Sequence, residues 1–493
     1  MDSTKIFLLI VGNLLNIILS LIFFYLIRIF FDIEIVGYYG TFLAFFTTFS
    51  LINHLGFTFA YLKFHAESKN SEEEALCNGT FLTYRLIQFA SYIIIVLIFI
   101  PLIPIYDGDI IVVYVFFIAM LFFRASFFDT ILLGKKEVFK NAISSIFLAF
   151  LKDLLLIVMI FYYSNTIWLL ISIVLISNVG YFLLNILFIR KRKFKKPNKE
   201  FMKKFLYYSL PFFLTSSLLF IVSNIDVLLI KAWSDIGNVA NYFTAKQSYS
   251  YFLIITNSIT SILISTFSRN ITEGKTKENI GIINYSHKIL NLLIVPIVFL
   301  TAIYAGDLFV IIFGDEYRLS GPILFIFVLT LIPLSIDIGN TIQLQALGEV
   351  RFIAKFSVLE NLFSIIFMIL FIHPSIFNLD VFGGAMSYIL AKILIQIIYR
   401  PILYKKFGLS FHWGSFRNLG IMCSIYFAHL WLRTVYSFSI YFIIILPIID
   451  IILYFLINYI FRGFSKEDFK FLFSIINIKN IYEVISSEFK RDE

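Results

Sequence analysis

Long apolar segments follow one another along the whole chain, separated by short polar or charged gaps. A helix needs about 20 apolar residues to cross a bilayer, and fourteen runs come close to that length. The pattern therefore predicts an all-α polytopic membrane protein of about 14 transmembrane helices. The expected spans are residues 6–30, 36–62, 80–105, 110–134, 141–163, 167–190, 205–231, 240–266, 288–313, 321–346, 352–372, 380–400, 415–436 and 439–461.

The basic residues fall almost wholly in alternate gaps. The N-terminus, the even-numbered gaps and the C-terminal tail hold 31 of the 40 Lys and Arg residues, and the odd-numbered gaps hold four, Arg28, Lys231, Arg318 and Arg433. Cytoplasmic loops carry the excess of Lys and Arg in membrane proteins. We therefore expect a multi-pass protein of the cytoplasmic membrane with both termini in the cytoplasm.

The composition agrees with this class. Hydrophobic residues make up 60% of the 493 residues and charged residues only 14%, which leaves no room for a sizeable soluble domain. The net charge of +9, gathered on one side, indicates contact with anionic lipid headgroups rather than nucleic acid. Cys77 and Cys423 lie far apart, each near the inner end of a span, so neither a disulfide nor a metal role is expected.

Two pairs of turns suggest an internal repeat. Arg28 is followed eight residues later by Val36-Gly37-Tyr38-Tyr39, and Lys231 is followed at the same distance by Val239-Ala240-Asn241-Tyr242, an offset of 203. Leu133-Gly134-Lys135 and Leu347-Gly348-Glu349 form the second pair, with an offset of 214. Six spans separate the related turns, so both repeats share one orientation and their axis runs along the membrane normal, as in parallel-repeat transporters.

The repeat and the basic stretch between its halves predict the domain organisation. The expected parts are an N-lobe at 1–190 (spans 1–6), a basic cytoplasmic linker at 191–204, a C-lobe at 205–403 (spans 7–12), spans 13 and 14 at 404–462, and a cytoplasmic amphipathic tail at 463–493.

No catalytic signature is present in the sequence. A phosphate-binding Gly-rich loop with Lys-Ser/Thr, a His-Glu-x-x-His motif and a Gly-x-Ser-x-Gly motif are all missing. The longest outer gap, about 305–320, is short for a membrane glycosyltransferase or polymerase. We therefore expect a transporter, not an enzyme, with no catalytic residues, metal site or cofactor.

The candidates for function are ionisable residues inside spans. Each costs about 2.5–3.5 kcal/mol on an insertion scale, so these side chains must face one another or a water-filled cavity. They are the cations Arg85, Arg124, Lys152, Lys246 and Lys392, and the acids Asp129, Asp153, Asp226, Asp337, Glu360 and Asp450.

Some of these residues have a structural interpretation as well. Lys152 and Asp153 are adjacent, so their side chains point about 100° apart, and one can close an ion pair while the other lines a cavity. Arg28 and Lys231 are either interfacial anchors or, as repeat-related cations at one depth, two contacts for a shared anionic ligand.

At several motifs the chain resembles the polysaccharide flippase branch of the multidrug/oligosaccharidyl-lipid/polysaccharide exporter superfamily, similar to O-antigen flippases. The likeness covers roughly 5–400 and departs from the family pattern at Ala240 and at 265–268. The motifs are Val36-Gly37-Tyr38-Tyr39, Leu55-Gly56-Phe57, Tyr208-Ser209-Leu210-Pro211, Asn224-Ile225-Asp226 and Leu344-Gln345-Ala346-Leu347-Gly348.

The resemblance implies two six-helix lobes around a central cavity that opens alternately to each side. It implies a polyprenyl-diphosphate-linked oligosaccharide as substrate, moved from the inner to the outer leaflet during surface polysaccharide biosynthesis, with polysaccharide assembly proteins as further partners. The substrate-contacting cations would be Arg28, Arg124, Lys231, Lys246 and Lys392, to which the residue argument above adds Lys152. Asp226 and Asp337 would hold cations in place or carry coupling protons, and Asp129 is a further charge partner.

Two alternatives remain open. One is a cation-coupled small-molecule or multidrug exporter of the same superfamily, whose cavity would be dominated by carboxylates. The other is a membrane polymerase or ligase acting on lipid-linked sugars, which the short outer gaps disfavour.

Overall fold

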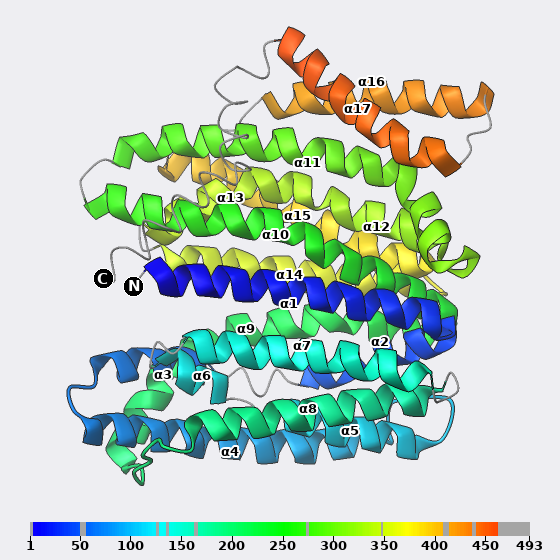
Figure 1. Ribbon diagram of the computed structural model, residues 1–493. Helices are drawn as coiled ribbons and strands as arrows, with labels where there is room; N and C mark the ends of the chain where they lie inside the picture. Colours follow the sequence, from blue (N-terminus) through cyan, green and yellow to red (C-terminus); the bar gives the residue numbers. More distant parts are fainter. Residues whose placement is uncertain are drawn as a thin grey trace. The chain divides into compact units, whose positions relative to one another are not determined.

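A computed structural model describes residues 3–49, 56–124, 128–134, 138–161, 166–272, 276–346, 349–407, 414–435 and 440–461. These residues form α-helices and one short 3-10 helix, with no strand among them, which confirms the predicted all-α class (Figure 1). The helices are α1 (Ser3–Phe30), α2 (Ile33–Phe49), α3 (Phe57–Glu67), α4 (Ser71–Phe99), α5 (Ile110–Arg124), α6 (Phe128–Gly134), α7 (Val138–Ile160), α8 (Ile167–Ile189), α9 (Lys199–Trp233), α10 (Ile236–Thr272), α11 (Thr276–Phe313), η2 (Asp315–Tyr317), α12 (Ser320–Leu329), α13 (Leu331–Ala346), α14 (Val350–Ile372), α15 (Asp380–Phe407), α16 (Gly414–Val435) and α17 (Ile440–Ile460).

Each predicted span corresponds to one helix or to two helices in succession. The span predicted at 321–346 is divided into α12 and α13. The described residues of 36–62 belong to α2 and α3 and those of 110–134 to α5 and α6, while 50–55 and 125–127 lie outside the described residues. Seven helical stretches of the described residues are long and apolar enough to cross a membrane, and four shorter apolar helices accompany them. The protein is thus a multi-pass membrane protein, while the number of fourteen crossings stays a prediction.

The division between α12 and α13 has a local cause in Pro333. Proline has no N–H to donate and its ring displaces the carbonyl four residues earlier, which belongs to Leu329, the last residue of α12. The chain turns at Thr330, whose N–H bonds Phe327 O at 3.0 Å, and α13 starts directly afterwards. By contrast, Pro296 lies inside α11 without ending it.

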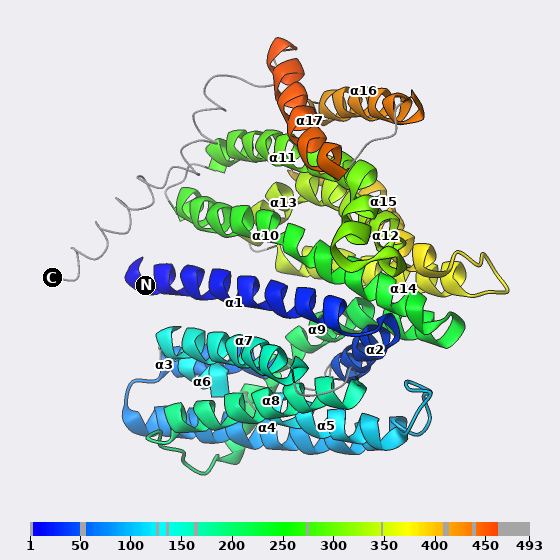
Figure 2. The same ribbon diagram turned by 45° about the vertical axis from the view of Figure 1, so that its right-hand side comes forward.

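The helices pack into two compact units, one ending at Ala232 and the other beginning at Trp233. In the first unit α7 lies between α1 and α8, as Figures 1 and 2 show, while α5 packs on α8 and α2 packs on α4 and α5. The start of α9 also belongs here, because Phe205 is fully buried in an aromatic cluster with Phe57, Phe64 and Phe81. The predicted lobes, which divide the chain at 191–204, stay a prediction; the contacts group α9 with the helices before it.

The basic segment between α8 and α9 is fastened along the start of α4. Lys195 N donates to Ala75 O at 2.8 Å, and Asn78 Nδ2 donates to Lys193 O at 3.1 Å. A Cβ at Gly79 would overlap the Lys195 carbonyl, so only glycine admits this close approach. We call residues 191–198 the strap.

In the second unit α11 lies between α10 and the pair α16 and α17 (Figures 1 and 2). The helices α10, α11 and α13 pack on one another, and α15 packs on α12 and α14. A buried polar contact joins α11, α16 and α17, since Tyr304 OH donates to Asp450 Oδ2 at 2.6 Å and His429 Nδ1 lies 3.6 Å from that oxygen. The amphipathic tail predicted at 463–493 lies outside the described residues.

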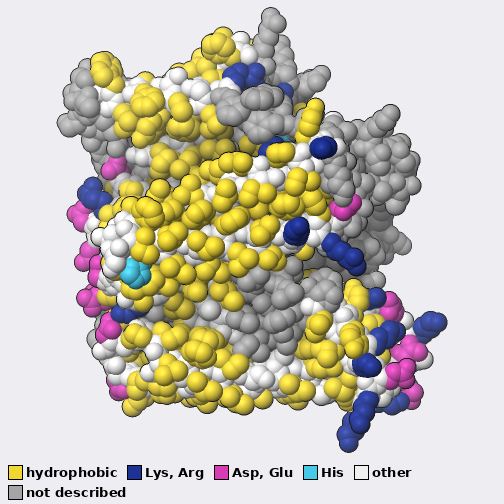
Figure 3. All heavy atoms as spheres, turned by 180° about the vertical axis from the view of Figure 1, so that it is seen from behind, with side chains coloured by type: hydrophobic (Ala, Val, Ile, Leu, Met, Phe, Trp, Pro, Cys, Tyr) yellow, Lys and Arg dark blue, Asp and Glu magenta, His cyan; other side chains and the backbone are white. Residues whose placement is uncertain are grey.

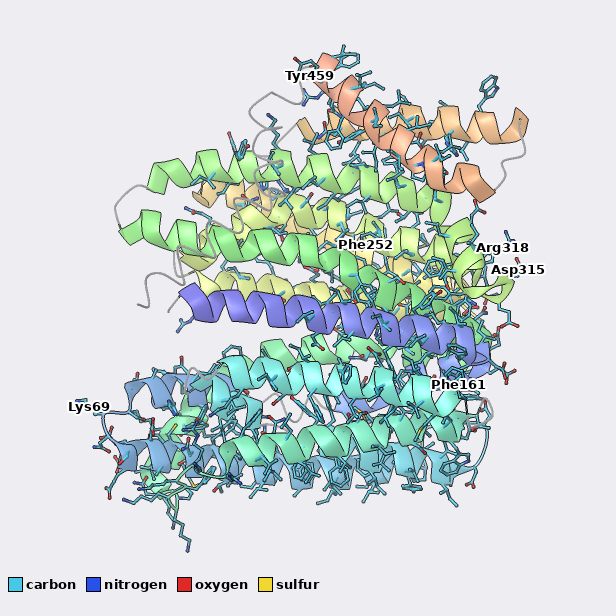
Figure 4. The ribbon with its side chains drawn as sticks, in the orientation of Figure 1. Lys69, Phe161, Phe252, Asp315, Arg318 and Tyr459 are labelled. Carbon is cyan, nitrogen blue, oxygen red and sulfur yellow. The ribbon has the colours of Figure 1, made fainter. Side chains whose placement is uncertain are left out.

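Within each unit the described turns lie at two ends of the helices. Lys69, after α3, and Phe161, after α7, lie at opposite ends of the first unit's helices (Figure 4). In the second unit the first turns of α10 contact the α11–α12 turn through Asn241 Nδ2, which donates to Glu316 O at 2.9 Å. The turn before α10 contacts the start of α15 through Ser234 Oγ, which donates to Asp380 Oδ2 at 2.8 Å. On the face shown in Figure 3, hydrophobic side chains cover most of the described surface, and most of the charged side chains lie toward its two sides. Which end faces the cytoplasm stays a prediction.

Candidate functional site

The first unit contains a cavity of about 290 Å³ between α1, α2, α5, α7 and α8. Five aromatic rings line it together with an amide, two hydroxyls and one cation. The lining residues are Asn16, Ser20, Phe23, Phe24, Tyr39, Phe123, Ser145, Leu148, Ala149, Lys152 and Tyr181. Aromatic faces beside hydroxyl and amide groups suit a ligand that has both apolar and polar surfaces.

Lys152 is the cation of this cavity. On α7 it shares a face with Ser145, Leu148 and Ala149, three to seven residues earlier, which puts all four side chains on the cavity wall. Its Nζ lies 5.8 Å from the Phe23 ring centroid. No Asp or Glu oxygen of the described residues lies within ion-pair distance of Nζ. Lys152 therefore presents an ammonium group to the cavity without a carboxylate partner among these residues.

Asp153, the next residue, does not line the cavity. Its side chain is buried, with 5% of the residue exposed. Neither carboxylate oxygen accepts a hydrogen bond from the residues that the structure describes. Lys152 is the charged neighbour that acts on it electrostatically, although the two groups do not form a close ion pair. The sequence left two interpretations of these neighbours open; the structure gives one residue to the cavity and buries the other.

Arg28 lies in the last turn of α1 and is 5% exposed. Its Nη1 donates to Phe24 O at 2.6 Å, and its guanidinium carbon is 5.2 Å from the Phe24 ring centroid. Phe24 and Tyr39, a second electrostatic neighbour of Arg28, both line the cavity. Arg28 thus lies beside the cavity, behind its aromatic wall, in the same unit as Lys152.

Lys231 has a different environment from its repeat partner. Its Nζ is 2.6 Å from Asp107 Oδ2, and the same oxygen accepts a hydrogen bond from Tyr38 OH at 2.7 Å. Hydrogen bonds from Lys231 and Tyr38 hold the pKa of the Asp107 carboxyl below its usual value. We call Tyr38, Asp107 and Lys231 the outer clasp, because it joins α2, the α4–α5 loop and α9 at the end predicted to face outward.

Lys392 and Asp337 come together in the second unit. Lys392 Nζ on α15 is 3.1 Å from Glu360 Oε2 on α14 and 3.6 Å from Asp337 Oδ2 on α13. Arg400, two turns further along α15, is an additional electrostatic neighbour of Asp337. Two cations and two carboxylates therefore balance, and the cluster binds three helices together.

The remaining predicted site residues are dispersed. Lys246 on α10 lies 3.3 Å from Tyr388 OH and 5.5 Å from that ring's centroid. Asp226 is fully buried in α9 and its Oδ1 accepts from Val227 N at 2.8 Å. The side chains of Arg124 and Asp129 lie outside the described part of the structure, although their backbones belong to α5 and α6.

Sequence reasoning did not find the partners of these cations. Asp107 lies in a loop 124 residues from Lys231, and no sequence pattern relates the two. Tyr38 was available from the Val36-Gly37-Tyr38-Tyr39 turn, which the repeat argument had singled out. Among the described residues no group of three or more His, Cys, Asp and Glu side chains could hold a metal ion.

The sequence of this chain matches the model of one protein family. The family model described as polysaccharide biosynthesis protein matches residues 3–271, more than half of the chain. No curated protein matches the sequence.

Solved structures match over most of the chain. A structure described as the lipid II flippase MurJ in an inward closed conformation is 16% identical, covers 92% of this chain and 98% of its own, and has a TM-score of 0.71. An inward-facing multidrug resistance MATE family transporter of the MOP superfamily is 14% identical, with 83% and 96% coverage and a TM-score of 0.64. A MOP superfamily transporter from Pyrococcus furiosus is 15% identical, with 82% and 97% coverage and a TM-score of 0.54. At these identities the likeness concerns the fold.

Proposed function

Because this chain belongs to the polysaccharide biosynthesis protein family and has the fold of the flippases and exporters of the MOP superfamily, we propose that it flips a polyprenyl-diphosphate-linked oligosaccharide. The lipid-linked glycan would move from the inner to the outer leaflet of the cytoplasmic membrane by alternating access, during synthesis of a surface polysaccharide. O-antigen-like glycans fall within this substrate class.

The observation that carries the proposal is the cavity of the first unit. Its five aromatic rings offer faces on which sugar rings can stack, and Asn16, Ser20 and Ser145 offer polar groups for sugar hydroxyls. Lys152 supplies one positive charge, which in a low-dielectric site attracts a phosphate or diphosphate strongly. One cation without a carboxylate partner among the described residues also permits release, because a cluster of several cations would hold the anion too tightly to turn over.

The other cations take supporting roles in this proposal. Arg28 lies behind Phe24 and Tyr39 and adds positive potential to the cavity without entering it. Lys231 and Lys392 would contact substrate only after leaving Asp107 and the Glu360–Asp337 pair, respectively. We place Lys246, Arg124, Asp129 and Asp226 on the transport path as predictions from the sequence.

The test uses the gene's own host. The gene is deleted and replaced by the wild type, by Lys152→Gln, or by the matched control Lys69→Gln, whose side chain is exposed. Polyprenyl-linked glycans are then probed with a membrane-impermeant lectin or oxidant. We expect glycans trapped on the inner leaflet and loss of surface polymer with Lys152→Gln, and normal export with Lys69→Gln. Full export by a normally inserted Lys152→Gln protein would contradict the cavity's role.

A cation-coupled small-molecule exporter is the second candidate, favoured by Asp337 and Glu360, two carboxylates that already hold one cation, Lys392 Nζ. Unchanged glycans together with altered drug tolerance in the deletion strain would support it. The membrane polymerase or ligase hypothesis gains nothing from the comparisons, whose solved structures are transporters. A purified protein that makes or breaks a glycosidic bond would revive it.

A further inference from the structure

The adjacent residues Lys152 and Asp153 differ in a way that the flippase proposal does not use. Lys152 lines the cavity. Asp153 is 5% exposed and neither oxygen accepts a hydrogen bond within the described residues. A buried ionised carboxylate that accepts no hydrogen bond from the protein is costly, and such a group stays ionised when a nearby charge compensates it.

The helices packed against α7 supply few such charges. They are α1, α6 and α8. On α8 the single titratable side chain is Tyr181, which lines the cavity. On α1 the charged residues Lys5 and Arg28 lie toward opposite ends, with Tyr25 between them and exposed, and α6 carries Asp129. Lys152 is the cation that acts electrostatically on Asp153.

We infer that Asp153 is a proton-binding site whose occupancy is linked to anion binding at Lys152. This inference rests on the proposed function insofar as the anion enters the same cavity. While the cavity is empty, the Lys152 ammonium compensates the Asp153 carboxylate. An anion that binds Lys152 neutralises the ammonium charge, so that this charge no longer compensates Asp153. Asp153 then takes up one proton and becomes a neutral carboxylic acid.

The linkage works in both directions. If anion binding favours protonation of Asp153, then protonation must favour anion binding by the same factor. The proton is released again when the anion leaves. The chemical class of the ligand is a phosphate or carboxylate carried on a larger amphipathic molecule, and the cation–carboxylate pair would bind this anion together with one proton.

The test measures proton uptake directly. The full chain in lipid nanodiscs is titrated with farnesyl diphosphate as the probe, in buffers of different ionisation enthalpy, so that calorimetry yields the protons taken up per bound ligand. The diphosphate contributes protons of its own, and Asp153→Asn measures that background. Glu200→Gln, at an exposed acid in the first turn of α9, is the matched control.

We expect wild type and Glu200→Gln to take up nearly one proton per ligand more than Asp153→Asn does. The Kd of the wild type should rise with pH more steeply than that of Asp153→Asn. The additional rise is at most about tenfold per pH unit, which is the limit for one linked proton. Asp153→Glu, which can still titrate, should restore the uptake. A difference infrared spectrum should show a carboxylic-acid band that appears with the ligand and is lost in Asp153→Asn.

Two failures are distinguishable. If the probe binds, Lys152→Gln weakens its binding, and wild type and Asp153→Asn take up equal numbers of protons, the linkage is wrong and the cavity assignment stands. If the probe binds the wild type and Lys152→Gln equally well, the cavity assignment fails and the linkage fails with it.

Discussion

Lys152 in the first unit and Lys392 in the second are both lysines inside apolar helices, yet their surroundings are opposite. Lys152 meets a cavity wall of aromatic rings and polar groups, whereas Lys392 lies between Glu360 and Asp337 on two neighbouring helices. The difference lies in the neighbouring helices and not in the lysine. A cation inside the helices is available to a ligand where no carboxylate on the packed helices forms a close ion pair with it.

The largest effect is expected when Lys392 is removed. Lys392→Met leaves two carboxylates in the membrane interior without their shared cation, and breaking a buried pair in this way costs about 3–5 kcal/mol. We expect a large loss of thermal stability in nanodiscs, partly recovered in the double variant Lys392→Met/Glu360→Gln. Unchanged melting of the single variant would show that Lys392 is not part of the packing.

Lys152→Gln should give the opposite outcome. Melting should fall much less than with Lys392→Met, because Lys152 forms no close ion pair with a described carboxylate and Asp153 can take up a proton when its compensating charge is removed. Affinity for farnesyl diphosphate should fall by about 10- to 150-fold, the equivalent of about 1.5–3 kcal/mol for a hydrogen bond to a charged group. Binding measured by calorimetry beside a melting curve separates the two effects; a strong loss of stability with normal binding would reverse the comparison.

The outer clasp provides an intermediate case, a paired cation at the membrane boundary. Asp107 is largely exposed, so Lys231→Met should cost at most about 1 kcal/mol. The pKa of Asp107 is lowered in the folded state, so the carboxylate binds fewer protons there than in the unfolded chain. The pair's contribution is therefore present above the usual pKa of 3.8 and lost as the pH falls below it. Melting curves of wild type and Asp107→Asn should differ most between about pH 5 and 7, and the difference should shrink as the pH falls below about 4.

The smallest effect is expected for Tyr388→Phe. This change removes one hydroxyl 3.3 Å from Lys246 Nζ while the ring remains, so the loss of stability should be about 0.5–1 kcal/mol. A larger loss would place Lys246 in the class of Lys392, held by its packing partners. A stability indistinguishable from the wild type, with weakened ligand binding, would place it in the class of Lys152.

Much of the fold was predictable because the bilayer constrains it so strongly. Span-length apolar runs and the alternation of Lys and Arg predicted the helices, and Pro333 explains why one run is divided into α12 and α13. The pairing of charges was not predictable. Lys392 and Glu360 lie 32 residues apart, and Lys231 and Asp107 lie 124 apart. These contacts depend on how helices rotate against one another, which apolar periodicity constrains weakly in helices that are hydrophobic all round.

The candidate site, too, was predictable in part. The sequence identified Lys152 and Asp153 as neighbours with different directions, because a helix turns about 100° per residue. It could not say which of the two meets a cavity, since the cavity arises from Phe23, Tyr39 and Tyr181 on three other helices. Arg28 and Lys231, related in sequence, have different neighbours: the Arg28 guanidinium lies against Phe24, whereas Lys231 Nζ contacts Asp107.

The strap, which lies against Gly79, determines where this chain can be cut into two fragments for coexpression. A fragment that stops before residue 191 lacks the hydrogen bonds from the strap to Ala75 O and to the Asn78 side chain, and it lacks the Phe205 ring that completes the aromatic cluster. It would expose the surface of α4 around Gly79 and the aromatic side chains that pack against Phe205. A cut after Ala232 keeps these parts on one polypeptide, so fragment complementation should succeed there and fail at the basic segment, even though the basic segment has the greater number of charges.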